Sequence, residues 1–108
     1  MAIIDFSAYV GLWPYWKTKY TTQADLIGLL DREGIDQAVI ASNRSIFFEP
    51  LQGNEDAVQF AREAQGRIHA FAVINPTDER HACDMLKSAH NSGMRGFRLF
   101  PQQHRYHL

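Results

Sequence analysis

Polar side chains that could take part in chemistry first occur inside an apolar stretch near the N-terminus. Residues 3–13 are mostly apolar and end in a glycine turn, a pattern typical of a buried strand. Successive strand side chains point to opposite faces, so Asp5, Ser7 and Tyr9 should share one face. Each unsatisfied buried polar group costs about 1–3 kcal/mol, so this row must be hydrogen-bonded or ligand-bound. Asp5 is a candidate catalytic group and Ser7 and Tyr9 are candidate substrate-binding groups, unless Asp5 only binds backbone amides and Tyr9 only packs as an aromatic ring.

A buried arginine is expected near the other end of the sequence. Arg98 alternates with Gly96 and Phe100 in a predicted strand, so these three residues should share one face. A guanidinium in that position needs a carboxylate or a bound anion, because an unpaired buried charge is costly. We favour a structural ion pair with Asp5 and keep binding of a substrate carboxylate by Arg98 as the alternative.

Three further candidates come directly after predicted strands. His104 could act as an acid or base near neutral pH, or could be disordered so near the end of the sequence. Asn75 could bind substrate or form a turn before Pro76. Trp13 belongs to aromatic loops that could line an apolar substrate pocket or form a subunit contact. The aromatic residues of these loops are Trp13, Tyr15, Trp16, Tyr20, Phe47 and Phe48.

Four apolar strands and three helices are predicted to position these side chains. The strands are expected at residues 3–10, 35–42, 68–75 and 94–100. Between them lie segments with helical apolar periodicity and capping residues. The first helix is expected to begin after Thr22 and end at Gly34, the second to run from the N-cap Asn54 to Gly66, and the third from Thr77 or Asp78 to Gly93.

The alternation of strands and helices implies an α/β fold with a parallel sheet. Such a sheet either closes toward a barrel with every helix outside, or stays open with helices on both faces. A complete TIM barrel needs roughly 200 residues or more, and this sequence has 108. We therefore predict a single domain, residues 1–108, that forms half of a TIM barrel. An open doubly wound sheet is the alternative.

Composition excludes some partners. The formal net charge is −1, and Lys and Arg are scattered, so no basic stripe for nucleic acid is present. Cys83 is the sole cysteine, and the sequence contains neither an apolar run of about 18 residues nor a leader-like segment. We expect a cytoplasmic protein with no membrane and no nucleic-acid partner.

Five short motifs resemble the N-terminal half of amidohydrolase-related TIM-barrel hydrolases. They lie at residues 3–11, 34–39, 53–55, 71–76 and 96–101, in the order and on the elements where that family has them. The segment from Pro101 through His104 to Tyr106 is also similar to the family's Pro-x-x-His-x-Tyr segment at the rim of the fourth strand. The resemblance implies that His104 is catalytic and that Tyr106 binds substrate.

Members of this family usually carry His-x-His at the end of the first strand, where the two imidazoles bind a divalent metal. Ser7 and Tyr9 occupy those positions here. A serine hydroxyl hardly ionises, and a tyrosine with a pKa near ~10 would have to lose its proton to the metal. The resemblance thus implies a metal such as zinc, but the ligand pair is absent. We predict no metal and no other cofactor.

The resemblance implies hydrolysis or decarboxylation of a small carboxylate-bearing or cyclic substrate, without the usual metal site. Arg98 would hold an anionic group and His104 would be the acid or base. Catalysis would then need a metal-free mechanism, or a missing C-terminal half or second chain to complete the site. The alternative is a non-catalytic remnant or a half-barrel module that forms a homo-oligomer.

Overall fold

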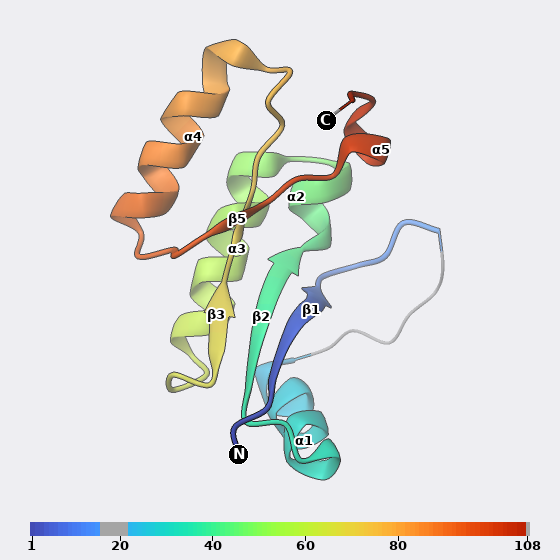
Figure 1. Ribbon diagram of the computed structural model, residues 1–108, viewed down its shortest axis with the longest axis vertical. Helices are drawn as coiled ribbons and strands as arrows, with labels where there is room; N and C mark the ends of the chain where they lie inside the picture. Colours follow the sequence, from blue (N-terminus) through green and yellow to red (C-terminus); the bar gives the residue numbers. More distant parts are fainter. Residues whose placement is uncertain (16–21, 108) are drawn as a thin grey trace.

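The computed structural model describes residues 1–15 and 22–107, along which strands and helices alternate (Figure 1). Trp16 and Tyr20 of the predicted aromatic loops lie outside the described residues. The elements are β1 (Ile4–Val10), α1 (Gln23–Glu33), β2 (Gln37–Ser42), α2 (Asn43–Phe47), α3 (Pro50–Arg62), β3 (Ile68–Ala70), β4 (Ala72–Val73), α4 (Glu79–Asn91), β5 (Phe97–Arg98) and α5 (Pro101–His104).

Every strand pair in the described chain is parallel. One sheet has the order β1-β2-β3, and β4 pairs with β5 in a second. The predicted third strand is divided at Phe71, so the described residues contain five strands and not four. The division reflects a change of partner: the Phe71 amide donates to the Ile40 carbonyl of β2 at 2.9 Å, whereas the Ala72 amide donates to the Gly96 carbonyl before β5 at 3.0 Å.

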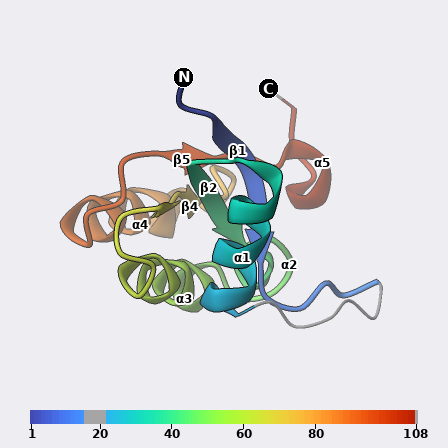
Figure 2. The same ribbon diagram turned by 90° about the horizontal axis from the view of Figure 1, so that it is seen from below.

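The three long helices α1, α3 and α4 cover one face of these strands (Figure 2). Alternate residues of the strands meet the apolar faces of the helices there, and this packing forms the main core. On the opposite face a smaller cluster contains Ala41, Ile46 and Val73, with Phe47 and Phe100 packed against it. Helices on one face are expected for a segment of a barrel, whereas a doubly wound sheet has helices on both faces. Members of the main core include Leu26, Leu30, Ile40, Ala57, Phe60, Ile68 and Ile74.

Helix α1 begins and ends as predicted. The Thr22 side chain accepts a hydrogen bond from the Asp25 amide at 3.1 Å, and the Asp25 carboxylate accepts one from the Thr22 amide at 3.0 Å, which forms a capping box. Gly34 ends the helix with a φ of 70°, a left-handed conformation that glycine adopts without strain. The residues that begin and end α1 lie close together in the sequence, which explains why both ends of this helix could be predicted from the sequence alone.

Helix α3 begins earlier than predicted, at Pro50. Proline suits the first helical position because its φ is already helical and no N–H is lost from the helix ladder. Asn54 was predicted as the N-cap and is instead a buried residue inside the helix. Its side-chain amide donates to the Val73 carbonyl at 3.1 Å and accepts from the Val73 amide at 2.9 Å. Asn54 therefore joins α3 to β4.

Two short helices were not predicted. Residues 43–47 form α2 and residues 101–104 form α5, and both ranges lie outside the predicted helices. Helix α2 follows directly on β2, whereas two residues separate α5 from β5. Their position at the ends of these strands makes them part of the candidate site described below.

Strand β1 lies at the edge of its sheet and was wrongly predicted to be buried. Its outer side has no strand partner in the described structure, and the Phe6 side chain is 61% exposed.

None of the helices in the described ranges has the length and apolar composition needed to cross a bilayer.

Candidate functional site

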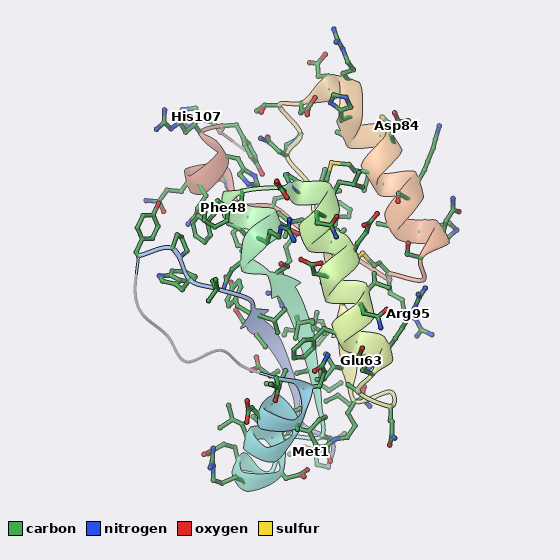
Figure 3. All side chains as sticks on the ribbon, turned by 180° about the vertical axis from the view of Figure 1, so that it is seen from behind. Met1, Phe48, Glu63, Asp84, Arg95 and His107 are labelled. Atoms are coloured by element: carbon green, nitrogen blue, oxygen red, sulfur yellow. The ribbon has the colours of Figure 1, made fainter. Side chains whose placement is uncertain are left out.

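The carboxyl ends of β1, β2 and β5 point toward the same end of the molecule (Figure 1). Residues 11–15, helix α2 and helix α5 follow these strand ends. Figure 3 shows Phe48 and His107 at this end and Met1 at the opposite end. Parallel α/β folds place their ligand sites at the carboxyl ends of the strands. We call this end the rim.

The predicted polar face of β1 is divided between the two sides of the sheet. Asp5 is in register with Ala38, but Tyr9 is in register with Ala41 after an irregularity between Asp5 and Ala8. Ala38 lies in the helix-side core, whereas Ala41 lies in the smaller cluster on the opposite face. An extra residue in one strand reverses the alternation beyond it. The prediction that Asp5 and Tyr9 share a face is therefore wrong.

Asp5 and Ser7 bond to each other and not to distant groups. The Asp5 carboxylate accepts a hydrogen bond from the Ser7 amide at 2.8 Å. This is the backbone role that the sequence left open for Asp5. The catalytic role of Asp5 and the substrate-binding role of Ser7 stay predictions.

Arg98 reaches across the face opposite the long helices and binds main-chain carbonyls. Its guanidinium donates to Phe6 O, to Val39 O at 3.0 Å and to Ala8 O at 3.4 Å. It also lies over the Tyr9 ring, 5.4 Å from the ring centroid. The favoured ion pair between Arg98 and Asp5 is not formed. The Arg98 guanidinium instead donates to main-chain carbonyls near the irregularity of β1 between Asp5 and Ala8. There the regular hydrogen bonding between β1 and β2 is interrupted.

Aromatic rings from three segments pack together at the rim. Trp13 contacts Phe47 with ring centroids 5.3 Å apart, and Tyr9 contacts Phe100 at 6.4 Å. Phe100 contacts His104 at 6.3 Å, and His104 stacks on Tyr106 at 6.5 Å. Phe47 and Phe100 both pack against the same small apolar cluster. We call these six residues the rim cluster: Tyr9, Trp13, Phe47, Phe100, His104 and Tyr106.

His104 is held in place by a contact with helix α2. Its Nε2 lies 2.9 Å from the Ile46 carbonyl oxygen, which can only accept, so Nε2 carries the proton and donates it. In the neutral imidazole the lone pair is then on Nδ1. This atom is buried and has no hydrogen-bond partner. A buried imidazole nitrogen with a free lone pair can accept a proton from a ligand.

Three more buried polar atoms at the rim lack partners: Trp13 Nε1, Asn43 Oδ1 and the Tyr106 hydroxyl. Asn43 begins α2 and is 4% exposed, and its Nδ2 donates to the Gly11 carbonyl at 3.1 Å. Buried polar groups in native proteins nearly always have partners. Together with His104 Nδ1, four such atoms lie in the segments that follow the strand ends.

Asn43 was missed by the sequence analysis. It follows the apolar run of β2 directly, in the way that Asn75 follows the next apolar run, so the same rule could have found it. Asn75 itself is engaged in a turn: its side-chain oxygen accepts from the Thr77 amide at 3.1 Å and from the Thr77 hydroxyl at 2.7 Å. This is the turn role that the sequence left open for Asn75.

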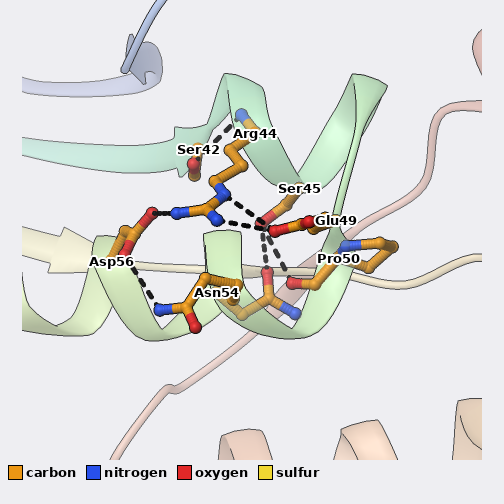
Figure 4. Close-up of polar contacts among 8 residues, drawn as sticks. Ser42, Arg44, Ser45, Glu49, Pro50, Asn54 and Asp56 are labelled. Atoms are coloured by element: carbon orange, nitrogen blue, oxygen red, sulfur yellow. Dashed lines mark hydrogen bonds and ion pairs between the residues drawn. The ribbon is translucent and has the colours of Figure 1, made fainter.

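A hollow lies on the other, helix-covered side of the strand ends. It has a volume of about 770 Å³, and Arg44, Glu49 and Asp56 form part of its wall. Figure 4 shows Arg44 between the two carboxylates, at 2.6 Å from Glu49 and 3.2 Å from Asp56. The hydrogen bond to Glu49 raises the pKa of the Arg44 guanidinium above its usual value. Arg44 therefore forms ion pairs with both carboxylates on the wall of this hollow.

The described residues do not fit the metal site that the family resemblance implies. Ser7 is exposed and Tyr9 packs against Phe100 and Arg98. Within residues 1–15 and 22–107, no three His, Cys, Asp or Glu side chains gather closely enough to hold a metal ion. No step of the chemistry below is therefore assigned to a metal.

No protein-family model matches this sequence, and no curated protein matches it either. Solved structures do. The fold is similar to part of two known enzymes. One is the 2,6-dihydroxybenzoate decarboxylase from Rhizobium, with a TM-score of 0.74 and 17% identity over 89% of this chain. The other is a probable 2-pyrone-4,6-dicarboxylic acid hydrolase from Acinetobacter baumannii, solved with citric acid bound, with a TM-score of 0.65 and 20% identity over 92% of this chain.

This chain spans little more than a third of the length of either enzyme, 37% and 38% respectively. At these identities the comparison establishes the fold of the chain.

Proposed function

We propose that this chain provides part of the active site of a hydrolase or decarboxylase of the amidohydrolase-related type, within half of a TIM barrel. Its substrate would be a small carboxylate-bearing or cyclic molecule bound at the rim. The sequence motifs and the fold similarity to two such enzymes support this proposal.

The observation that carries the proposal is the state of His104. Its Nε2 is fixed by the Ile46 carbonyl, and its Nδ1 is left as a buried acceptor beside the Tyr106 ring. An acid/base imidazole needs this arrangement, with one nitrogen oriented by the protein and the other free for the substrate. Tyr9, Trp13 and Tyr106 would line the substrate, and Arg98 would order the strand end that carries Tyr9.

The reaction would proceed without the usual metal pair, because Ser7 and Tyr9 stand where the family has its first two histidines. His104 would take or give the proton that hydrolysis or decarboxylation requires. Metal analysis of the purified protein checks this point. Stoichiometric zinc or manganese would contradict it.

The direct test is turnover of 2,6-dihydroxybenzoate and of 2-pyrone-4,6-dicarboxylate by the purified chain, followed by ultraviolet absorbance. His104→Gln keeps a side-chain donor but cannot take a proton, so we expect its rate to fall about 100-fold or more. His107→Gln, at an exposed position nearby, is the matched control and should retain the full rate. Equal rates in the wild type and His104→Gln would remove His104 from the mechanism.

A second candidate function, a self-associating half-barrel module, is favoured by the exposed edge of β1. Ile4 and Phe6 are 45% and 61% exposed there, beside backbone groups that no strand covers in the described structure. Open edges of this kind pair readily with another chain. Light scattering after size-exclusion chromatography distinguishes the two cases, because a stable monomer would exclude the module.

A further inference from the structure

A second hollow lies away from the rim, between the end of α3, the start of β3 and the residues that follow α4. It has a volume of about 180 Å³. Its buried wall is apolar, because Ile68, Ala70 and Met94 are less than a tenth exposed there and lie beside Val58 and Ala61 of α3. Strand β3 begins at this place, so the hollow lies toward the amino ends of the strands. We call it the α3–α4 hollow.

Two arginines from different elements also line the α3–α4 hollow. Arg62 is the last residue of α3, and Arg95 lies between α4 and β5. A left-handed turn directs the chain back from α4 toward β5: Gly93 has a φ of 85°, and the Met94 amide donates to the Ala89 carbonyl at 3.0 Å. Figure 3 shows Arg95 beside α3. The fold therefore brings two positive charges, 33 positions apart in the sequence, to one small hollow.

Neither guanidinium has a partner in the described structure. Arg62 and Arg95 are exposed, and their side chains form no hydrogen bond or ion pair with the described residues. No described Asp or Glu lines the hollow. Glu63, the neighbour of Arg62 in the sequence, instead accepts hydrogen bonds from Gln23 and Gln59. The two positive charges are thus not compensated by the described part of the chain.

Arg67, which precedes β3, shows the contrasting case of an arginine with a structural role. Its guanidinium donates to the Asp31 carboxylate at 2.5 Å and to the carbonyls of Ile35 and Asp36, each at 3.0 Å. These bonds connect the segments that lead into β2 and β3. Arg62 has no comparable internal partners, and neither has Arg95, so their donors are available to a ligand.

The chemistry of the hollow favours an anion with two charges. Guanidinium groups bind carboxylate and phosphate oxygens through pairs of parallel hydrogen bonds. Two such groups at one hollow are neutralised by a dianion, whereas a single charge leaves one of them unpaired. The half-buried Ser92 also lines the hollow, and its hydroxyl can donate a further hydrogen bond. The volume of about 180 Å³ suits a small ion better than a drug-sized molecule.

We infer that the α3–α4 hollow binds a small oxyanion with two negative charges, held by Arg62 and Arg95. Inorganic phosphate, the phosphate group of a small molecule and a short dicarboxylate share this chemistry. The hollow lies apart from the rim, so the inference goes beyond the proposed function and does not depend on it.

The test is a titration of the full chain with phosphate, malonate and acetate at constant ionic strength, in a buffer alkaline enough to keep phosphate doubly ionised. The readout is the ¹H–¹⁵N amide spectrum. We expect the Ser92 and Gly93 amides to shift saturably with a dianion that binds about fivefold more tightly than acetate. The tighter of the two dianions identifies a phosphate group or a dicarboxylate as the ligand. Arg62→Gln and Arg95→Gln should each weaken its binding about fivefold.

Arg32→Gln on α1 and Arg80→Gln on α4 are the matched controls, because each removes one exposed arginine that does not line the hollow. Both should bind the dianion as tightly as the wild type. An equal loss in these controls would show that only the overall charge matters, and it would overturn the inference. Equal affinity for acetate, shifts that do not saturate, or an unchanged affinity in Arg62→Gln or Arg95→Gln would overturn it as well.

Discussion

At the scale of single residues, two helix glycines show how differently the same residue type can be constrained. A Cβ at Gly53 of α3 would overlap the Ser45 backbone nitrogen and Oγ of α2, whereas a Cβ at Gly28 of α1 would meet nothing within 4 Å. Gly53 therefore permits the close approach of α3 to α2. Gly28 has no such role.

Gly53→Ala should destabilise the protein by about 1–3 kcal/mol, because the overlap involves main-chain atoms that cannot rotate away. Gly28→Ala should stabilise it by about 0.5–1 kcal/mol, since alanine favours a helix interior over glycine. Urea unfolding of both variants measures the difference. Equal stabilities would show that α2 and α3 are not packed as described.

Asn54 also has a role that its position in a helix does not reveal. It satisfies both main-chain groups of Val73, and its Oδ1 accepts from the buried Ser45 hydroxyl at 2.9 Å. Asn54→Ala leaves the buried amide and carbonyl of Val73 without the partners that Asn54 supplies and should cost about 2–4 kcal/mol. Gln52→Ala, on the exposed side of the same helix, should stay within about 0.5 kcal/mol of the wild type in the same unfolding assay. A loss of similar size in both variants would contradict the role of Asn54.

At the scale of elements, Arg98 connects β5 to β1 and β2 across the face that no long helix covers. Arg98→Met should destabilise the protein by about 1–3 kcal/mol, because the carbonyls of Phe6, Ala8 and Val39 lose their donor. Arg95→Met is the control, since Arg95 is exposed and has no hydrogen bond or ion pair in the structure. Thermal unfolding checks the pair. If Arg98→Met were as stable as the control, the guanidinium would be free to bind a substrate anion, which is the alternative that the sequence left open.

The elements that the sequence predicted well are those with local signals. Thr22, Asp25 and Gly34 lie within 12 residues of one another along the chain and define α1 completely. The start of α3 was missed because the partner of Asn54 is Val73, 19 residues away. No nearby residue distinguishes a capping asparagine from one that bonds to a distant strand.

The sequence indicated which residues follow the strand ends, but not how their side chains are oriented there. Position after a strand drew attention to Trp13 and His104, which the structure places in the rim cluster, and the same rule would have found Asn43. The faces of Asp5 and Tyr9 depend on one extra residue in β1, and strand alternation alone cannot place such an irregularity. The orientation of His104 depends on the Ile46 carbonyl, 58 residues away in the sequence.

At the scale of the whole molecule, the chain has one face covered by long helices and an opposite face covered only in part. The second face carries Arg98, the rim cluster and the exposed side of β1, and it would be the interior if the strands were part of a closed barrel. The two similar enzymes are more than twice as long as this chain.

If that open face associates with a second copy, charge on the β1 edge should prevent it. Phe6→Lys places a positive charge at a 61% exposed position and should leave the protein monomeric at concentrations where the wild type self-associates. Lys87→Glu, which changes charge on α4 and lies far from that edge in the sequence, serves as the control. Sedimentation velocity over a concentration series gives the result, and identical association of all three proteins would exclude the β1 edge as the contact.

The central claim is that the rim binds a ligand through His104, whose Nε2 is oriented by the Ile46 carbonyl. The most direct measurement is the ¹H–¹⁵N long-range spectrum of the histidine side chains, recorded with and without 2,6-dihydroxybenzoate. Our account predicts the Nε2–H tautomer for His104 and a shift of its Nδ1 resonance on titration, with His81 and His107 unchanged. An Nδ1–H tautomer of His104 in the free protein, or a spectrum that 2,6-dihydroxybenzoate leaves unaltered, would contradict it.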